Sequence, residues 1–204
     1  MCAAERRIKL YINLNGKVIS WCSEIKYLGV YISAATTFKC NFHNAKIKFC
    51  RSLNGLLSKL GPSPHIGITL YLISTKCNPI LFYGLEWMRL SKTNYNSISY
   101  PYNSAYMKLF STFDKNTILL CQFYSGELPL SYALDIQTLN FYAKLSELSS
   151  NPSNILYKWF GMDERIALEI KYGIGGENVF RDYNKLIRKF FNDYCASLLW
   201  FKWS

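Results

Sequence analysis

The sequence contains no Asp or Glu between Glu24 and Glu86. The same interval carries seven basic residues: Lys26, Lys39, Lys46, Lys48, Arg51, Lys59 and Lys76. Over all 204 residues, 24 Lys and Arg stand against 13 Asp and Glu, which gives a formal net charge of +11. A basic excess concentrated in one stretch favours partners that carry phosphate groups, either nucleic acid or an anionic membrane surface.

Long apolar runs and closely spaced metal ligands are also missing. No run approaches the roughly 18 apolar residues of a membrane-spanning helix, and the N-terminal "MCAAERRIKL" lacks a signal-peptide core. No two of the seven cysteines lie two or four residues apart, and there are only two histidines. The sequence therefore predicts no membrane partner, no zinc site, free thiols, and an intracellular protein of the nucleus or cytoplasm that is not secreted.

The N-terminal residues have the pattern of a small sheet. Apolar and polar residues alternate over 8–14, the pair Asn15-Gly16 favours a two-residue hairpin turn, and 17–21 predicts the return strand. A third strand is expected over 26–32, with Gly29 in its middle. Glycine weakens a strand unless it forms a bulge or another backbone comes very close.

The period then changes to three and four residues, which predicts an amphipathic helix that ends at Gly61-Pro62. Its apolar face is Phe42, Ala45, Phe49, Leu53, Leu56 and Leu60. Its opposite face is Asn44, Lys48, Arg51, Gly55 and Lys59. Further helices are expected at about 65–77, 79–91 and 95–113, and from a loop at 125–129 to about residue 148. A final amphipathic segment has an apolar face made of Val179, Tyr183, Leu186, Phe190, Tyr194 and Leu198.

These patterns predict an α+β fold: a short N-terminal antiparallel β-meander, then a mostly α-helical bundle and C-terminal helices. We expect three domains, at residues 1–33, 34–115 and 116–204. The segment "SSNPSN" at 149–154 is the strongest linker signal.

Several blocks of the sequence resemble LINE-like (non-LTR) retrotransposon reverse transcriptases. "INLNGKVISW" followed by "EIKYLGVYI" is similar to the segment just after the catalytic palm of that family. The blocks "NPILFYGLEWMRL", "PYNSAYMKLFSTFDK", "CQFYSGELPLSYALD" and "KWFGMDE" are similar to its downstream regions, in the same order. The resemblance covers roughly residues 6 to 165.

The resemblance implies a nucleic-acid site with two parts. The segment Lys26, Tyr27, Leu28 and Gly29 corresponds to the primer grip, where Gly29 would let the strand approach the sugar–phosphate backbone. The following helices correspond to a thumb that clamps the template–primer duplex. On the helix that ends at Gly61, Lys48, Arg51 and Lys59 would contact phosphates, and Lys46 is a weaker candidate near the apolar border.

The catalytic residues of that family are not in this sequence. Reverse transcription uses metal ions held by carboxylates, including an adjacent Asp-Asp pair in the family, and this chain has no such pair. The only adjacent acids are Asp163-Glu164, which we expect at the start of a helix. We therefore expect no catalytic residues, metal site or cofactor in this chain, although the parent enzyme would need Mg²⁺. The chain alone should not extend a primer.

The favoured hypothesis is a C-terminal fragment of a reverse transcriptase. Its expected partners are an RNA or RNA–DNA duplex and the fingers-and-palm portion of the same polyprotein, which would precede Met1. Three alternatives remain: a stand-alone basic nucleic-acid-binding module, a non-functional remnant of a retroelement, and a protein that lies on a membrane surface. The last rests on "LLWFKWS" at 198–204, whose Trp and Lys suit a membrane interface.

Overall fold

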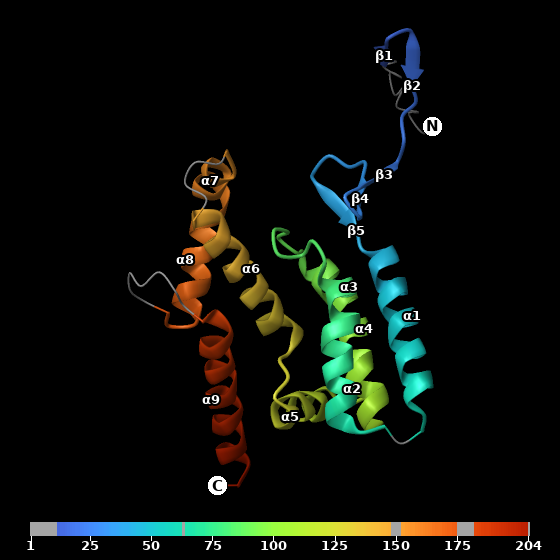
Figure 1. Cartoon of the computed structure of the whole chain (residues 1–204). Helices are drawn as coiled ribbons and strands as arrows, with labels where there is room; N and C mark the ends of the chain where they lie inside the picture. The colour runs from blue at the N-terminus through green and yellow to red at the C-terminus, as the bar shows by residue number, and fades with distance from the viewer. Residues whose placement is uncertain (1–11, 63, 148–151, 175–181, 204) are drawn as a thin grey trace, which may run out of the picture. The chain divides into compact units, whose positions relative to one another are not determined.

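The structure is a computed structural model that describes residues 12–62, 64–147, 152–174 and 182–203. The chain divides into two compact units, Met1–His43 and Asn44–Ser204. Strands occur in the first unit and helices in the second, so the predicted α+β class is confirmed (Figure 1). The predicted domain boundaries after residues 33 and 115 remain predictions.

The first unit contains two separate antiparallel sheets. Its strands are β1 (Ile12–Leu14), β2 (Lys17–Ile19), β3 (Glu24–Tyr27), β4 (Val30–Ser33) and β5 (Lys39–Asn41). β1 pairs with β2 across the predicted turn, in which Asn15 and Gly16 have φ values of 49° and 78°. The hairpin at Asn15-Gly16 is therefore confirmed within the described residues, and residues 8–11 of the predicted strand lie outside them.

The single third strand predicted over 26–32 is wrong. β3 ends at Tyr27 and β4 begins at Val30, and Tyr27 pairs with Val30 across a second two-residue turn. The turn residues, Leu28 and Gly29, have φ values of 44° and 85°. Leucine has no intrinsic preference for a turn, so the sequence predicts residues 26–32 as one strand and misses the turn at Leu28-Gly29. β5, which pairs with β4, has no clear sequence signal.

In the second unit, α1 (His43–Leu60) matches the predicted amphipathic helix. Its buried residues include Phe49 and Leu53, both 0% exposed. Next come α2 (Ile66–Leu72), the π-helical turn η1 (Ile73–Cys77), α3 (Asn78–Phe82) and α4 (Lys92–Phe110). The helix predicted over 79–91 is wrong beyond Phe82, because Tyr83 has an extended ψ of 120° and Gly84 has a φ of 76°.

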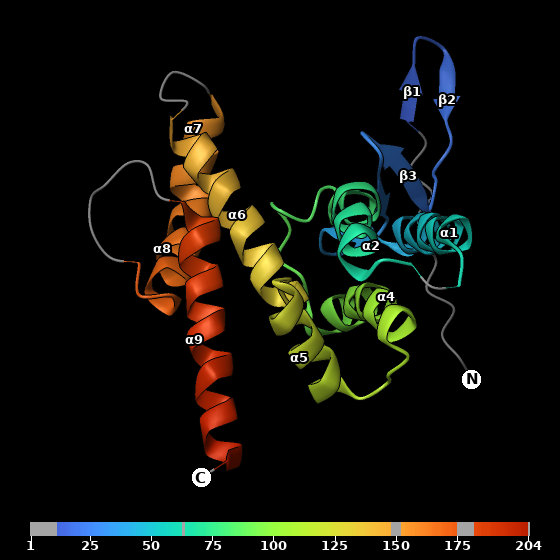
Figure 2. The ribbon, with the colours of Figure 1, turned by 60° about the horizontal axis from the view of Figure 1, so that its bottom comes forward.

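Within the described residues, four of the five C-terminal helices of the second unit, all but the short α7 (Pro152–Leu156), contribute to one apolar core. The four are α5 (Lys115–Ser125), α6 (Leu130–Glu147), α8 (Met162–Lys171) and α9 (Tyr183–Trp203), with the π-helical turn η2 (Tyr157–Gly161) before α8. α6 lies beside α9 and α8 (Figure 2). Their core contains Leu128, Ile136, Leu139, Tyr172, Ile174, Tyr183, Ile187, Phe191 and Cys195.

The predicted apolar face of α9 is confirmed at Tyr183, which is 3% exposed, but is wrong by about one position further along the helix. Ile187, Phe191 and Cys195 are almost fully buried, whereas the predicted Leu186, Phe190 and Tyr194 are 39–46% exposed beside them. Both rows are apolar, and only packing against α6 decides which one faces the core. Of the predicted face, Val179 and the Leu198 side chain lie outside the described residues.

Candidate nucleic-acid interface

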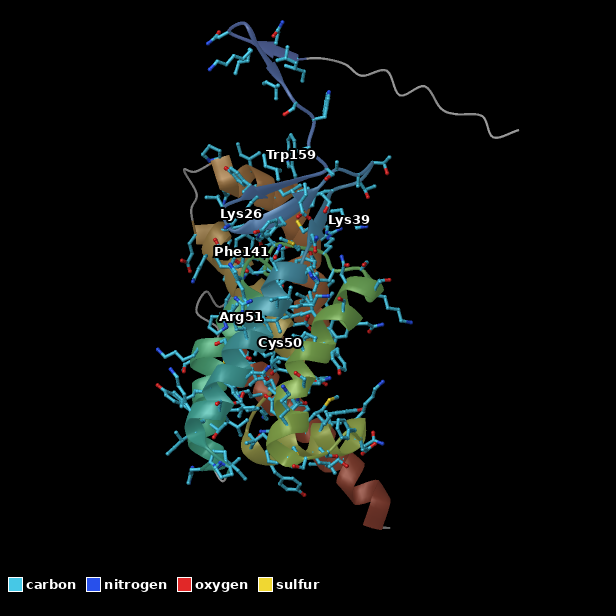
Figure 3. The ribbon with its side chains drawn as sticks, turned by 90° about the vertical axis from the view of Figure 1, so that its right-hand side faces the viewer. Lys26, Lys39, Cys50, Arg51, Phe141 and Trp159 are labelled. Atoms are coloured by element: carbon cyan, nitrogen blue, oxygen red, sulfur yellow. The ribbon has the colours of Figure 1, made fainter. Side chains whose placement is uncertain are left out.

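The exposed side of α1 is basic. Lys48, Arg51 and Lys59 are all exposed, and Asn44 and Gly55 lie on the same helical face at spacings of three and four residues. The 18 residues of α1 include no Asp or Glu. Helix geometry places Lys48 and Lys59 about 16 Å apart along the axis, at a rise of ~1.5 Å per residue. The three cations therefore lie along one exposed face of the helix, and Arg51 among them is labelled in Figure 3.

These cations are not used in ion pairs inside the described part of the chain. The ion pairs found there are Arg89–Glu164, Arg165–Glu169 and Lys171–Asp135, and none of them includes a residue of α1. Since salt bridges within the described residues do not neutralise the face, its charge is directed to solvent and to any anionic ligand.

Lys46 belongs to a different side of α1. Its Nζ atom donates a hydrogen bond of 2.5 Å to Ser97 Oγ of α4, and the side chain is only partly exposed. The structure thus separates the four predicted cations of α1 into an exposed set of three and Lys46, which faces a neighbouring helix.

A further exposed cation, Lys108, comes from α4 and was missed by sequence reasoning. Its Nζ atom donates a 2.6 Å hydrogen bond to Oδ1 of Asn54, the residue that precedes Gly55 on α1. The contact joins residues 54 positions apart in the sequence, so no local pattern indicates it. It brings positive charge to the edge of the exposed face of α1.

The predicted primer-grip residues form the tip of the β3–β4 hairpin. Tyr27 and Leu28 are 63% and 73% exposed, so this tip presents an aromatic and an aliphatic side chain to its surroundings. Lys26 Nζ lies 5.9 Å from the ring centroid of Tyr31, its partner on β4. Lys39 of β5 lies on the same sheet (Figure 3).

The physical reason proposed for Gly29 needs correction. Gly29 is not in the middle of a strand but at the second position of a tight turn, with φ at 85°. Both central positions of such a turn require positive φ, which glycine adopts without steric cost. The turn alone explains this glycine, and approach to a primer is not needed to account for it.

Acidic side chains of the second unit form structural contacts with tyrosines. Glu164 Oε2 accepts 2.8 Å and 3.0 Å hydrogen bonds from Tyr142 OH and from Arg89 Nε. Burial and the hydrogen bond to Glu164 raise the pKa of the Tyr142 hydroxyl, so it stays protonated and donates. Asp163 and Glu164 lie in the first turn of α8, which confirms the predicted helix start.

Neither a metal centre nor a membrane span emerges from the described residues. Within them, no group of three or more His, Cys, Asp and Glu side chains is arranged to hold a metal ion. No helix among them is both long and apolar enough to cross a bilayer. Their six cysteines are free thiols, and burial raises the pKa of the Cys40 and Cys195 thiols.

Comparison of the chain with protein-family models, with curated proteins and with solved structures finds no match in any of the three. The functional assignment therefore rests on the residues and geometry described above and on the resemblance of the sequence blocks.

Proposed function

We propose that this chain binds an RNA or RNA–DNA duplex through the exposed face of α1, as a C-terminal fragment of a retrotransposon reverse transcriptase without catalytic aspartates of its own. The observation that carries the proposal is the line of Lys48, Arg51 and Lys59 on a helix without acids. Such cations bind phosphates irrespective of sequence, and the released counterions make the affinity dependent on salt.

A nucleic acid suits this face better than a membrane surface. An amphipathic helix binds a membrane by inserting its apolar side chains below the headgroups. In α1, Phe49 and Leu53 are 0% exposed, because they are packed inside the second unit. The helix exposes one large apolar side chain, Ile47 at 42%, and otherwise offers charge to a ligand. The "LLWFKWS" segment, on which the membrane alternative rests, has side chains outside the described residues.

The test is to measure duplex affinity as a function of salt concentration by fluorescence anisotropy with a labelled RNA–DNA hybrid. Engagement of about three phosphates gives a slope of log affinity against log salt near −3, and Lys108 adds about one more if it also takes part. The Lys48→Ala, Arg51→Ala, Lys59→Ala triple variant should flatten the slope strongly.

A matched control removes three exposed cations elsewhere. Lys144→Ala, Lys185→Ala, Lys189→Ala lowers the formal charge of +11 by the same three units but leaves α1 intact. The proposal fails if both triple variants weaken binding equally, since net charge alone would then explain it. It also fails if the wild-type chain binds anionic vesicles but no duplex.

For the first unit we propose two contacts. The tip formed by Lys26, Tyr27, Leu28 and Gly29 contacts the primer end of the duplex, and the apolar side chains of the sheets pack on the preceding fingers-and-palm segment. Ile12, Leu14, Val18 and Trp21 are 51–69% exposed, and an isolated two-stranded hairpin is only marginally stable in water.

The packing proposal is tested by reading the coding frame upstream of Met1. A palm sequence with an Asp-Asp pair in frame would provide the partner for this surface, and co-expression should then protect the amides of β1 and β2 from hydrogen exchange. Stop codons upstream would favour a retroelement remnant. Primer extension by the chain alone, with Mg²⁺ and all four nucleotides, should yield no product.

A further inference from the structure

Gly55 is a costly residue for its position in α1. It lies in the helix interior, where glycine is less stable than alanine because it loses more backbone freedom on folding. Apart from its chain neighbours and the backbone of its own helix, no atom lies within 4 Å of a Cβ atom placed on Gly55, and the φ of Gly55 is not in the left-handed region. Neither packing nor backbone conformation within the described chain therefore requires a glycine here.

The surroundings of Gly55 are cationic. Arg51 precedes it by four residues and Lys59 follows it by four, so all three lie on one exposed face. Between these two long side chains the helix backbone has no side chain over it. A ligand that lies along the face would meet the backbone at Gly55 and a cation on either side.

We propose that Gly55 is the point at which the sugar–phosphate backbone of a duplex comes closest to α1, while Arg51 and Lys59 bind the phosphates on either side. This inference rests on the proposed function, because it assumes a duplex as the ligand. A duplex carries one negative charge per roughly 1.7 Å of its axis, so the stretch between the two cations faces several phosphates. Any side chain larger than hydrogen at residue 55 would hold that backbone away.

The experiment compares Gly55→Gln with Ala167→Gln, both measured with the same labelled RNA–DNA hybrid at fixed low salt. Each change adds one neutral side chain at an exposed helical position, and Ala167 lies on α8, away from the cations of α1. We expect Gly55→Gln to weaken binding about tenfold and Ala167→Gln to leave it unchanged. Gly55→Ala should fall between Gly55→Gln and the wild type.

The melting temperature separates blocked binding from misfolding. Gln and Ala both favour helix over Gly, so both Gly55 variants should melt at or above the wild-type temperature. Wild-type affinity in Gly55→Gln overturns the inference. If the triple variant at Lys48, Arg51 and Lys59 nonetheless binds the duplex more weakly than the wild type, the proposed function still holds. Absence of any duplex binding by the wild-type chain overturns both.

Discussion

Arg51 and Arg165 show two uses of charge within the second unit. Arg165 is enclosed by partners: its guanidinium donates to Glu169 at 3.0 Å, to Tyr157 OH at 3.2 Å and to Tyr183 OH at 3.1 Å. Arg51 is exposed, and no ion pair within the described residues includes it. Arg165 links η2, α8 and α9, whereas the charge of Arg51 is available to a ligand.

Acidic residues differ in the same way between the C-terminal helices and the segment from α1 to α4. Around α8, Asp135 accepts hydrogen bonds from Lys171 Nζ and Tyr172 OH, both at 2.6 Å. The described residues of α1 to α4 contain Glu86 as their only acid. Charge in the C-terminal helices thus contributes to packing, and charge on α1 remains unbalanced. Substitutions that remove charge or add volume should therefore affect stability in one region and binding in the other.

The largest expected effect is that of Gly161→Ala. A Cβ atom at Gly161 would lie 2.6 Å from Cε1 of Tyr142 and 3.0 Å from Cδ2 of Tyr157. The Tyr142 ring cannot move away freely, because its hydroxyl donates to Glu164. We expect a loss of up to about 3 kcal/mol in the free energy of unfolding, as for other overpacked cores.

Gly55→Ala is the matched substitution in the other region. It should raise the free energy of unfolding by up to about 1 kcal/mol. The new methyl group clashes with no neighbouring segment, and alanine loses less backbone freedom than glycine when the helix forms. Urea denaturation of both variants measures the difference. Effects of the same sign at the two positions would remove the contrast between them.

Next in size is Arg165→Met. It should lower the free energy of unfolding by about 2 kcal/mol, because partly buried Glu169 loses its ion pair and the hydroxyls of Tyr157 and Tyr183 each lose a hydrogen-bond donor. Arg51→Met should change the free energy of unfolding by no more than about 0.5 kcal/mol and should instead weaken duplex binding. A comparable loss of stability in both variants would mean that Arg51 has a structural partner.

A smaller effect is expected at the two turns of the first unit. In the second of them, exposed Leu28 has a positive φ that is unfavourable for leucine. Leu28 and Asn15 occupy equivalent positions before Gly29 and Gly16, with φ values of 44° and 49°. Asn tolerates positive φ and Leu does not, so Leu28→Asn should stabilise its hairpin by about 1 kcal/mol and Asn15→Leu should destabilise the other hairpin by a similar amount.

Hydrogen exchange of the strand amides measures both changes. If Leu28 contacts the primer end, Leu28→Asn should also weaken duplex binding, while Asn15→Leu should not. Faster exchange of the β3 and β4 amides in Leu28→Asn would contradict the assigned turn.

The smallest effect concerns Glu127, between α5 and α6. Burial raises the pKa of its carboxyl above the ordinary 4.5, and Arg188 only partly offsets this. The folded chain therefore holds the proton of Glu127 more tightly than the unfolded chain does. The stability contributed by this proton is fully present below the unfolded pKa and is lost as pH rises through the folded pKa. Glu127→Gln should thus raise the free energy of unfolding by less than about 1 kcal/mol at pH 7 and leave it unchanged at pH 3. An equal gain at both pH values, measured by urea unfolding, would exclude this ionisation as the cause.

Local sequence patterns account for the elements whose signals lie within a few residues of one another. Asn15-Gly16 specifies its turn through the φ preferences of the two residues, and the apolar period of α1 specifies both the helix and its exposed cations. The face formed by Lys48, Arg51 and Lys59 follows from that period alone, since helix geometry places residues three and four apart on one side.

Other features depend on contacts between distant segments. Residues 26–32 read as one strand, although the chain turns at Leu28-Gly29, because pairing of β3 with β4 outweighs the poor fit of leucine at positive φ. Likewise, packing against α6 selects Ile187, Phe191 and Cys195 of α9 over the neighbouring apolar row.

By itself, the sequence determined the class of fold, the first hairpin, the helix α1 and its basic face, because each depends on backbone preferences and periodicity over short distances. Only the tertiary structure decided that Lys46 faces Ser97, that Lys108 joins Asn54 and that Gly55 has nothing packed against it. Those outcomes depend on which helices meet, and the free energy of such contacts comes from residues tens of positions apart.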